Sequence, residues 1–391
     1  MIELEYPPPS ERVVLASLLT PAMDKSLFDQ DMQEMIMLCN TAGATVVNTF
    51  IQKMEKPRAS TYVGEGKLQV IHGYMRQNNC KTLVMDAALS PGQIRNIEKV
   101  IDGKVIDRSQ LILDIFAQHA RTNEARIQVE LAQLRTLYPR LTHAWSHFSQ
   151  QVGGIGTTGP GEKQLEVDKR LVQKKITELR RKLKKIESSR LTQRHQRGLS
   201  MNCALVGYTN VGKSSLLNAL CGADVLVQNK LFATLDTATR KTFIPRIGEV
   251  VISDTVGFLR RLPLHLVASF KSTLEVVRTA DILLIVMDAA SDWKDQQYAT
   301  VNEVLTELGA VENLRLLIFN KADLIDNPYT KKSISLLYPG SILVSAFNPD
   351  DIRALKEQIA HSVLAVKRER AMTDIIEQKT KLAHRLPSEL L

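Results

Sequence analysis

The first part of the chain, up to about residue 120, alternates short apolar runs with stretches of helical periodicity. An apolar run of four to eight residues predicts a buried strand, and apolar positions three or four residues apart predict a helix. Strands are expected at residues 12–18, 44–50, 82–85 and 104–106, and helices at residues 25–38 and 93–101. This alternation predicts a small α/β unit over residues 1–120.

Two long apolar stripes with four-and-three spacing follow. The first comprises Ile127, Leu131, Leu134, Tyr138 and Leu141, and the second comprises Val172, Ile176, Leu179, Leu183 and Ile186. Such stripes are packing faces of helices, so we expect a long antiparallel helical hairpin over residues 121–197. Pro139 is expected to kink or end the first helix, because proline lacks the backbone donor that a helix interior needs.

A glycine-rich loop separates the two stripes. Its five glycines are Gly153, Gly154, Gly156, Gly159 and Gly161. Ordering glycines costs conformational entropy, so a loop of this kind is either a flexible connector or kept for close approach to a ligand or polymer backbone. We favour close approach, because a strongly basic helix begins just after the loop.

Buried strands are expected again at residues 202–206, 249–253, 314–319 and 341–344, and each ends in polar residues. They predict a second α/β domain over residues 198–366. The short basic extension over residues 367–391 is expected to be a helix continuation with a loose tail.

A complete phosphate-binding loop, G-x-x-x-x-G-K-S, lies between the strand at 202–206 and a helix expected at 215–220. The backbone N–H groups of such a loop and the helix N-terminus bind phosphates. Lys213 is expected to bridge the β- and γ-phosphates, and the Ser214 hydroxyl to bind Mg²⁺. The predicted nucleotide contacts are Gly207, Tyr208, Thr209, Asn210, Val211, Gly212, Lys213, Ser214 and Ser215.

Two motifs at later strand ends predict the rest of a guanine-nucleotide site. The first is Asp254, Thr255, Val256 and Gly257 (D-x-x-G), in which the carboxylate orders a Mg²⁺-bound water and the glycine N–H contacts the γ-phosphate. The second is Asn320, Lys321, Ala322 and Asp323 (N-K-x-D). The Asp323 carboxylate suits the N1–H and 2-amino donors of guanine, and a site built around those bonds rejects adenine.

Two further short segments complete the predicted site. A backbone N–H at Ser345 or Ala346 is expected to reach the guanine O6. Phe232, Ala233 and Thr234 lie in a polar stretch between the loop and the D-x-x-G motif, and Thr234 is the preferred Mg²⁺ ligand, with Thr237 and Thr239 as competitors. The predicted catalytic residues are Lys213, Thr234 and Gly257, and the metal ligands are Ser214, Thr234 and, through water, Asp254.

Phe258 occupies the position after the D-x-x-G motif, where many GTPases carry a glutamine that orients the attacking water. Phenylalanine cannot do this, so we expect slow intrinsic hydrolysis that a partner or ion accelerates. Asn210 leaves two interpretations open: in one group of GTPases an asparagine there accompanies a bound K⁺, but asparagine is also a common turn residue.

The net charge of +9 is concentrated in one segment. Residues 169–197 contain twelve lysines and arginines and two acids, which favours RNA as a partner over a solvated helix face. The residues expected to contact RNA, besides the five loop glycines, are Lys174, Lys175, Arg180, Arg181, Lys182, Lys184 and Lys185.

The composition and the start of the sequence indicate where in the cell the protein is expected. The sequence has no apolar run long enough to span a membrane and no signal-peptide pattern at its start. Its four cysteines lack metal-ligand spacing and are expected to be reduced. We expect a cytoplasmic location, with a peripheral membrane position as an alternative, and a monomer.

Several stretches together resemble the HflX GTPases of the Obg–HflX group. They are residues 105–134, residues 153–170 (GGIGTTGPGEKQLEVDKR), residues 231–240 (LFATLDTATR) and residues 254–263 (DTVGFLRRLP). The likeness runs from about residue 12 to residue 366. It implies a P-loop GTPase domain preceded by an N-terminal region that binds the large ribosomal subunit, with the glycine-rich loop near the peptidyl-transferase centre. It also implies GTP-driven dissociation of stalled or idle ribosomes.

The chain departs from the family pattern after the switch threonine, where Thr237 and Ala238 stand in place of the usual Pro-Thr. The glycine-rich signature also differs at Thr158, Lys163, Val167 and Lys169, and a further C-terminal domain of many relatives is not expected here. Two alternatives to ribosome splitting are therefore kept. One is a GTP-dependent ribosome-binding or rRNA-binding assembly or regulatory factor, and the other is a regulatory GTPase with protein partners only.

Overall fold

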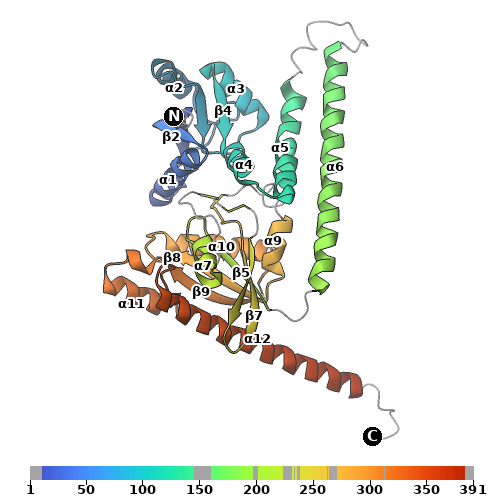
Figure 1. Cartoon of the computed structure of the whole chain (residues 1–391). Helices are drawn as coiled ribbons and strands as arrows, with labels where there is room; N and C mark the ends of the chain where they lie inside the picture. Colours follow the sequence, from blue (N-terminus) through green and yellow to red (C-terminus); the bar gives the residue numbers. More distant parts are fainter. Residues whose placement is uncertain are drawn as a thin grey trace, which may run out of the picture. The chain divides into compact units, whose positions relative to one another are not determined.

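The computed structural model describes residues 11–144, 160–196, 201–222, 231–232, 234–235, 238–261, 263, 271–311 and 313–383. The chain forms two compact units, the first mainly from residues up to 191 and the second mainly from residues 192 onward (Figure 1). Each unit is described by itself.

A four-stranded parallel sheet in the order β2-β1-β3-β4 forms the centre of the first unit. Its strands and helices are β1 (Glu11–Leu19), α1 (Lys25–Thr41), β2 (Ala44–Lys53), α2 (Glu65–Gln77), β3 (Thr82–Met85), α3 (Pro91–Ile101), β4 (Lys104–Asp107) and α4 (Arg108–His119). Every strand and helix predicted over residues 1–120 is present, so the α/β fold expected there is confirmed.

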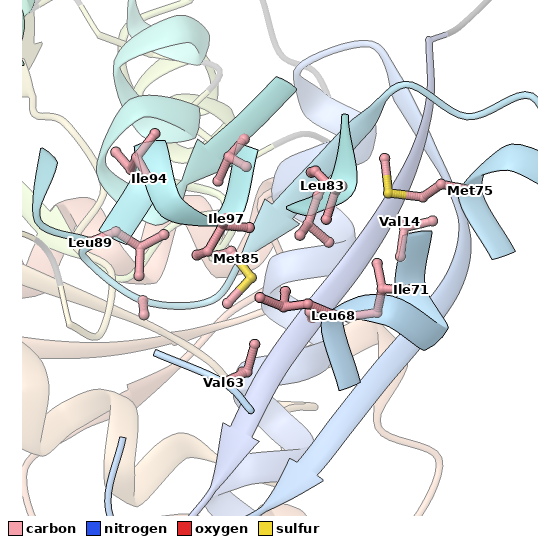
Figure 2. Close-up of a cluster of buried hydrophobic side chains, with 14 of the residues drawn as sticks. Val14, Val63, Leu68, Ile71, Met75, Leu83, Met85, Leu89, Ile94 and Ile97 are labelled. Carbon is pink, nitrogen blue, oxygen red and sulfur yellow. The ribbon is translucent and has the colours of Figure 1, made fainter. Parts of the chain in front are cut away.

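The core of this unit explains why apolar runs predicted its strands. Every residue of β3 is buried, because helices cover both faces of a parallel sheet. Figure 2 shows side chains of β1, β3, α2 and α3 meeting in one cluster, including Val14, Leu68, Leu83 and Ile97.

The two apolar stripes lie on α5 (Asn123–Ala144) and α6 (Pro160–Gln196), which run side by side within the first unit (Figure 1). The buried contact between the two helices consists of Ile127, Leu131, Ile176 and Leu179, with Leu134, Val172, Leu183 and Ile186 packed at its margins. Eight of the ten stripe residues therefore pack between the helices, as predicted. Tyr138 is half-buried outside this contact, and the side chain of Leu141 lies outside the described residues.

Pro139 was expected to kink or end the first helix. α5 continues past it to Ala144, so the proline does not end the helix, and the kink stays a prediction. α6 begins at Pro160, where proline suits a first helical turn, so Gly161 belongs to a helix. Gly153, Gly154, Gly156 and Gly159 lie outside the described residues.

A six-stranded sheet in the order β10-β9-β8-β5-β7-β6 forms the centre of the second unit, parallel except for β6. Its strands are β5 (Met201–Gly207), β6 (Thr239–Ile244), β7 (Gly248–Asp254), β8 (Ile282–Asp288), β9 (Leu314–Asn320) and β10 (Ile342–Leu343). Its helices are α7 (Lys213–Cys221), α9 (Lys271–Arg278), α10 (Lys294–Glu307), the 3₁₀ helix η1 (Ala322–Leu324), α11 (Pro328–Leu337) and α12 (Pro349–Ala383).

The carboxyl ends of parallel strands share one edge of a sheet, which is where open α/β sheets bind ligands. Gly207, Asp254 and Asn320 end β5, β7 and β9 at this edge, and Ser345 follows β10. The motifs predicted to act together are thus brought to one place. Farther along the chain, α12 continues beyond residue 367, as expected of a helix extension.

Among the described residues, no helix combines the length and the apolar character that crossing a membrane requires.

Candidate functional site

The phosphate-loop sequence adopts a tight turn between β5, which ends at Gly207, and α7, which begins at Lys213. Gly212 has φ +90°, and a Cβ on it would overlap the side-chain amide of Asn320. Asn210 also has positive φ (+62°), which asparagine tolerates better than most residues. Residues 207–215 are all buried or half-buried, so the loop encloses a small concave site at the start of a helix.

Lys213 is the one buried lysine among the described residues. Its ammonium donates to the carbonyl oxygens of Tyr208, at 2.8 Å, and Gly207, at 3.3 Å, and thus lies inside the loop. Burial lowers the pKa of Lys213 to about 8, although the nearby carboxylate of Asp254 raises it. An anion bound beside this lysine would favour its charged form.

Three oxygen-bearing side chains from distant positions meet beside this lysine. The Ser214 hydroxyl donates to Asp254 Oδ2 at 2.6 Å and lies 2.7 Å from Thr234 Oγ1. Asp254 is fully buried, and its Oδ1 has no hydrogen-bond partner among the described residues. Burial raises the pKa of Asp254, and Lys213 and Ser214 oppose that shift. These residues fit a Mg²⁺ ion, which takes carboxylate and hydroxyl oxygens.

The structure also separates the candidate switch threonines. Thr234 is the one beside Ser214, whereas the Thr239 hydroxyl lies 2.9 Å from Ser253 Oγ in the β6–β7 pair. Thr237 and Ala233 lie outside the described residues. Phe232, predicted to contact the nucleotide, is buried and has φ +54°.

The D-x-x-G segment is tied to the phosphate loop by backbone hydrogen bonds. Phe258 N–H donates to the Gly207 carbonyl at 3.0 Å, and Thr209 N–H donates to the Phe258 carbonyl at 2.8 Å. The Phe258 side chain is only 2% exposed, so it serves as core rather than reaching toward a water. A Cβ on Gly257 would lie 2.7 Å from Thr209 Cα and 3.0 Å from Lys213 Nζ, so only glycine fits.

The other two residues of the D-x-x-G motif are also buried. The Thr255 hydroxyl donates to the Leu205 carbonyl at 2.7 Å, and the Val256 side chain is 7% exposed. Both residues therefore support the turn from within the sheet.

Asn320 joins the phosphate loop to the base-recognition segments. Its Nδ2 donates to the Val211 carbonyl at 3.0 Å, and its Oδ1 accepts from Ala346 N–H at 3.1 Å. Lys321 has φ +64°, and its ammonium pairs with Asp288 Oδ2 at 2.6 Å. The bracing role expected for Asn320 therefore has a direct structural basis.

A pocket of about 410 Å³ contains Asp323 in its wall. Ser345 Oγ donates to Asp323 Oδ1 at 2.6 Å, and Ser345 N–H donates to Asp351 Oδ2 at 2.8 Å. Phe347, which is 82% exposed, also lines this pocket. Sequence reasoning missed Asp351 and Phe347. The one feature of the sequence that could have indicated them is that both follow the Ser345-Ala346 pair within a few residues.

The seven basic residues expected to contact RNA lie elsewhere, on α6, and all are exposed. Among them, Lys175 pairs with Glu130 at 3.4 Å and Lys182 pairs with Glu178 at 2.7 Å. Both pairs are surface contacts, which contribute little to stability. α6 therefore presents a basic surface that stays exposed when the helix packs against α5.

Comparison with known proteins decides the family. Three family models match consecutive parts of the chain: GTP-binding GTPase N-terminal (residues 29–117), GTP-binding GTPase Middle Region (residues 119–197) and 50S ribosome-binding GTPase (residues 202–321). A GTPase HflX of Flavobacterium psychrophilum is 46% identical over 313 residues, covering 80% of this chain and 76% of that relative. This chain belongs to the HflX GTPase family.

Other HflX relatives agree. The protein from Alkalihalophilus pseudofirmus is 42% identical over 355 residues, covering 90% of this chain and 83% of its own, and that from Escherichia coli is 43% identical over 300 residues, covering 76% and 70%. The crystal structure of SsGBP with GDP has a TM-score of 0.50 and 24% identity, covering 90% of this chain and 98% of that one. This structural likeness supports the fold alone.

Family membership establishes the reaction. This HflX protein is a GTP phosphohydrolase, with GTP as its substrate and Mg²⁺ as the usual cofactor of the class. The oxygen ligands gathered around Ser214 suit that ion.

Proposed function

We propose that this GTPase binds the large ribosomal subunit and uses GTP to dissociate stalled or idle ribosomes into subunits. The exposed basic face of α6 is the observation that carries the proposal, because GTP hydrolysis by itself needs no such surface. The description of the matched GTPase-domain model, 50S ribosome-binding GTPase, supports the choice of partner. A cytoplasmic monomer fits this role.

The proposal assigns work to each part of the chain. Residues 1–120 form the N-terminal α/β unit, residues 121–197 an antiparallel hairpin, residues 198–366 the GTPase domain and residues 367–391 an extension. The ion pair between Glu130 and Lys175, and the groove that Tyr138 shares with α6 residues from Glu166 onward, support the antiparallel direction. The glycine-rich loop would then lie at the hairpin tip, approaching rRNA near the peptidyl-transferase centre.

In the nucleotide site, Lys213 would bridge the β- and γ-phosphates. Ser214 and Thr234 would hold Mg²⁺, and Asp254 would hold it through a water. The Gly257 N–H contacts the γ-phosphate. Mg²⁺ supplies charge neutralisation at the phosphates. Asp323 accepts from guanine, and the Ser345-Ala346 backbone reaches O6 once it exchanges its present partners.

Catalysis in this proposal depends on the ribosome. The buried Phe258 side chain leaves no residue at that position to orient water, so turnover by the isolated protein is slow and the large subunit raises it. A K⁺ ion beside Asn210 is a second proposed accelerator of hydrolysis, and replacing K⁺ with Na⁺ in the assay tests it.

A sucrose-gradient experiment tests the proposal. Intact ribosomes are incubated with the protein and either GTP or a non-hydrolysable analogue, and the subunit fractions are measured. We expect subunits to accumulate and the protein to migrate with the large subunit. A variant reversing the charges of Lys174, Arg180, Arg181 and Lys184 should lose both effects and keep GTP binding.

The outcomes separate the alternatives. Migration with the large subunit without dissociation would favour the assembly or regulatory factor, which the exposed basic face fits equally well. Absence of any ribosome association would favour a GTPase with protein partners only.

A further inference from the structure

A groove of about 780 Å³ lies beside α6 and reaches Tyr138 on α5. Its α6 wall includes four cations: Lys169, Arg170, Lys174 and Arg181. Tyr138 is the one stripe residue in its lining, and none of the eight residues that form the packed contact between α5 and α6 lines it. The groove is therefore a surface feature distinct from the helix contact.

Its charge balance favours an anion. Two acids, Glu166 and Glu178, also line it, but Glu178 is paired with Lys182, which lies outside the lining. Within the part of the chain that the structure describes, no ion pair involves any of the four cations. The groove thus presents several positive charges against one acid that has no cationic partner of its own.

The ring of Tyr138 favours a single strand over a duplex as the ligand of the groove. Tyr138 is half-buried in the wall across from the cations. A duplex keeps its bases stacked inside and offers only phosphates and sugars, whereas an unpaired base can stack on an aromatic ring or a guanidinium plane. A cationic row with an aromatic beside it is typical of single-strand binding.

We propose that this groove binds a short single-stranded RNA segment, with one base stacked on Tyr138 and its phosphates along Lys169, Arg170, Lys174 and Arg181. This inference rests on the proposed function, because it states which kind of rRNA segment the basic helix α6 binds. It adds three residues, Tyr138, Lys169 and Arg170, to the predicted RNA contacts.

Fluorescence anisotropy on the full-length protein tests this. The probes are an end-labelled single-stranded RNA of eight nucleotides and a labelled RNA duplex, each titrated at several salt concentrations. The single strand should bind more tightly, and Tyr138→Ala should weaken it about tenfold, the usual worth of one stacked base. Tyr138→Phe keeps the ring and should bind like the wild type.

Matched controls distinguish the groove from general charge. Tyr329→Ala removes a tyrosine that is exposed elsewhere on the chain, and Arg76→Ala removes an exposed arginine outside the groove. Neither should change the binding of the single strand. Arg170→Ala combined with Arg181→Ala should lower the salt dependence by about two counterions.

The inference is overturned if duplex and single strand bind equally, or if Tyr138→Ala binds as the wild type does. Co-sedimentation with large subunits separates its failure from that of the proposed function. If subunits bind while the single strand does not, only the groove assignment is wrong; if neither binds, the proposed function is also wrong.

Discussion

The pH dependence of GTP binding tests whether Lys213 contacts the phosphates from its buried position. In this test the pH of the GTP-binding measurement is raised from 7 to 9. Burial lowers the pKa of this lysine from 10.5 to about 8 in the nucleotide-free protein, so its neutral form predominates above pH 8. Binding a polyphosphate requires the charged form, and the negative charge of the phosphates raises the pKa again.

The magnitude follows from the charged fraction of the free protein. With a pKa of about 8, roughly nine-tenths of the lysine is charged at pH 7, half at pH 8 and about a tenth at pH 9. The Kd for GTP should therefore rise about tenfold from pH 7 to pH 9.

The lowered pKa of Lys213 also makes the stability of the folded protein depend on pH. Between pH 8 and pH 10.5 the unfolded chain binds more protons at this lysine than the folded protein does. The free energy of unfolding of the nucleotide-free protein should therefore rise with pH across this window, by about 3 kcal/mol in total.

Titration calorimetry at pH 7, 8 and 9 measures the Kd. Asp323→Asn serves as the control, because it weakens binding at every pH and should keep the tenfold ratio. Lys213→Ala should bind weakly and show no such ratio. A wild-type Kd that stays constant from pH 7 to pH 9, or an unchanged ratio in Lys213→Ala, would refute the assigned contact.

The sequence predicted the parts of this site that are local or lie at strand ends. The turn of the phosphate loop depends on neighbouring residues, and Gly212 shows why: its positive φ and its closeness to Asn320 both require glycine. The contact between Ser214 and Asp254 was also predictable, because each residue comes at or just after the carboxyl end of a strand. The carboxyl ends of parallel strands share one edge of the sheet.

Contacts between separate loops were not predictable. Asp351 binds the Ser345 N–H from the first turn of α12, and Asp288 pairs with Lys321 from the end of another strand. No periodicity connects these positions, because each pairing depends on where two turns place their side chains. β6 was also missed, since five of its six residues are polar or exposed.

Buried charges in the first unit escaped prediction for a related reason. Arg108 is 2% exposed and pairs with Asp86 at 3.1 Å and with Glu34 at 2.5 Å. A buried charge is tolerated only with partners, and these come from α1 and from the residue after β3. Sequence spacing of 22 and 74 residues does not show that they meet.

Three further predictions concern single residues of the nucleotide site. Asp323→Asn should weaken GTP binding more than tenfold while leaving ATP binding as weak as before, as measured by competition, because it removes a charge-assisted pair of hydrogen bonds. Asp351→Ala frees the Ser345 N–H, which the proposed function uses for the guanine O6, so GTP should bind at least as tightly as in the wild type. A loss of GTP affinity in titration calorimetry would show instead that Asp351 orients the Asp323 carboxylate through Ser345. Gly257→Ala should abolish turnover, because its Cβ would lie 2.7 Å from the backbone of the phosphate loop and 3.0 Å from the catalytic ammonium, and the backbone cannot yield as a flexible side chain can. Gly73→Ala, whose Cβ meets nothing within 4 Å in α2, is the matched control and should hydrolyse GTP normally in a phosphate-release assay. Normal turnover by Gly257→Ala would show that the loop and the D-x-x-G turn move apart during the reaction, and the close approach seen here would then have no catalytic meaning.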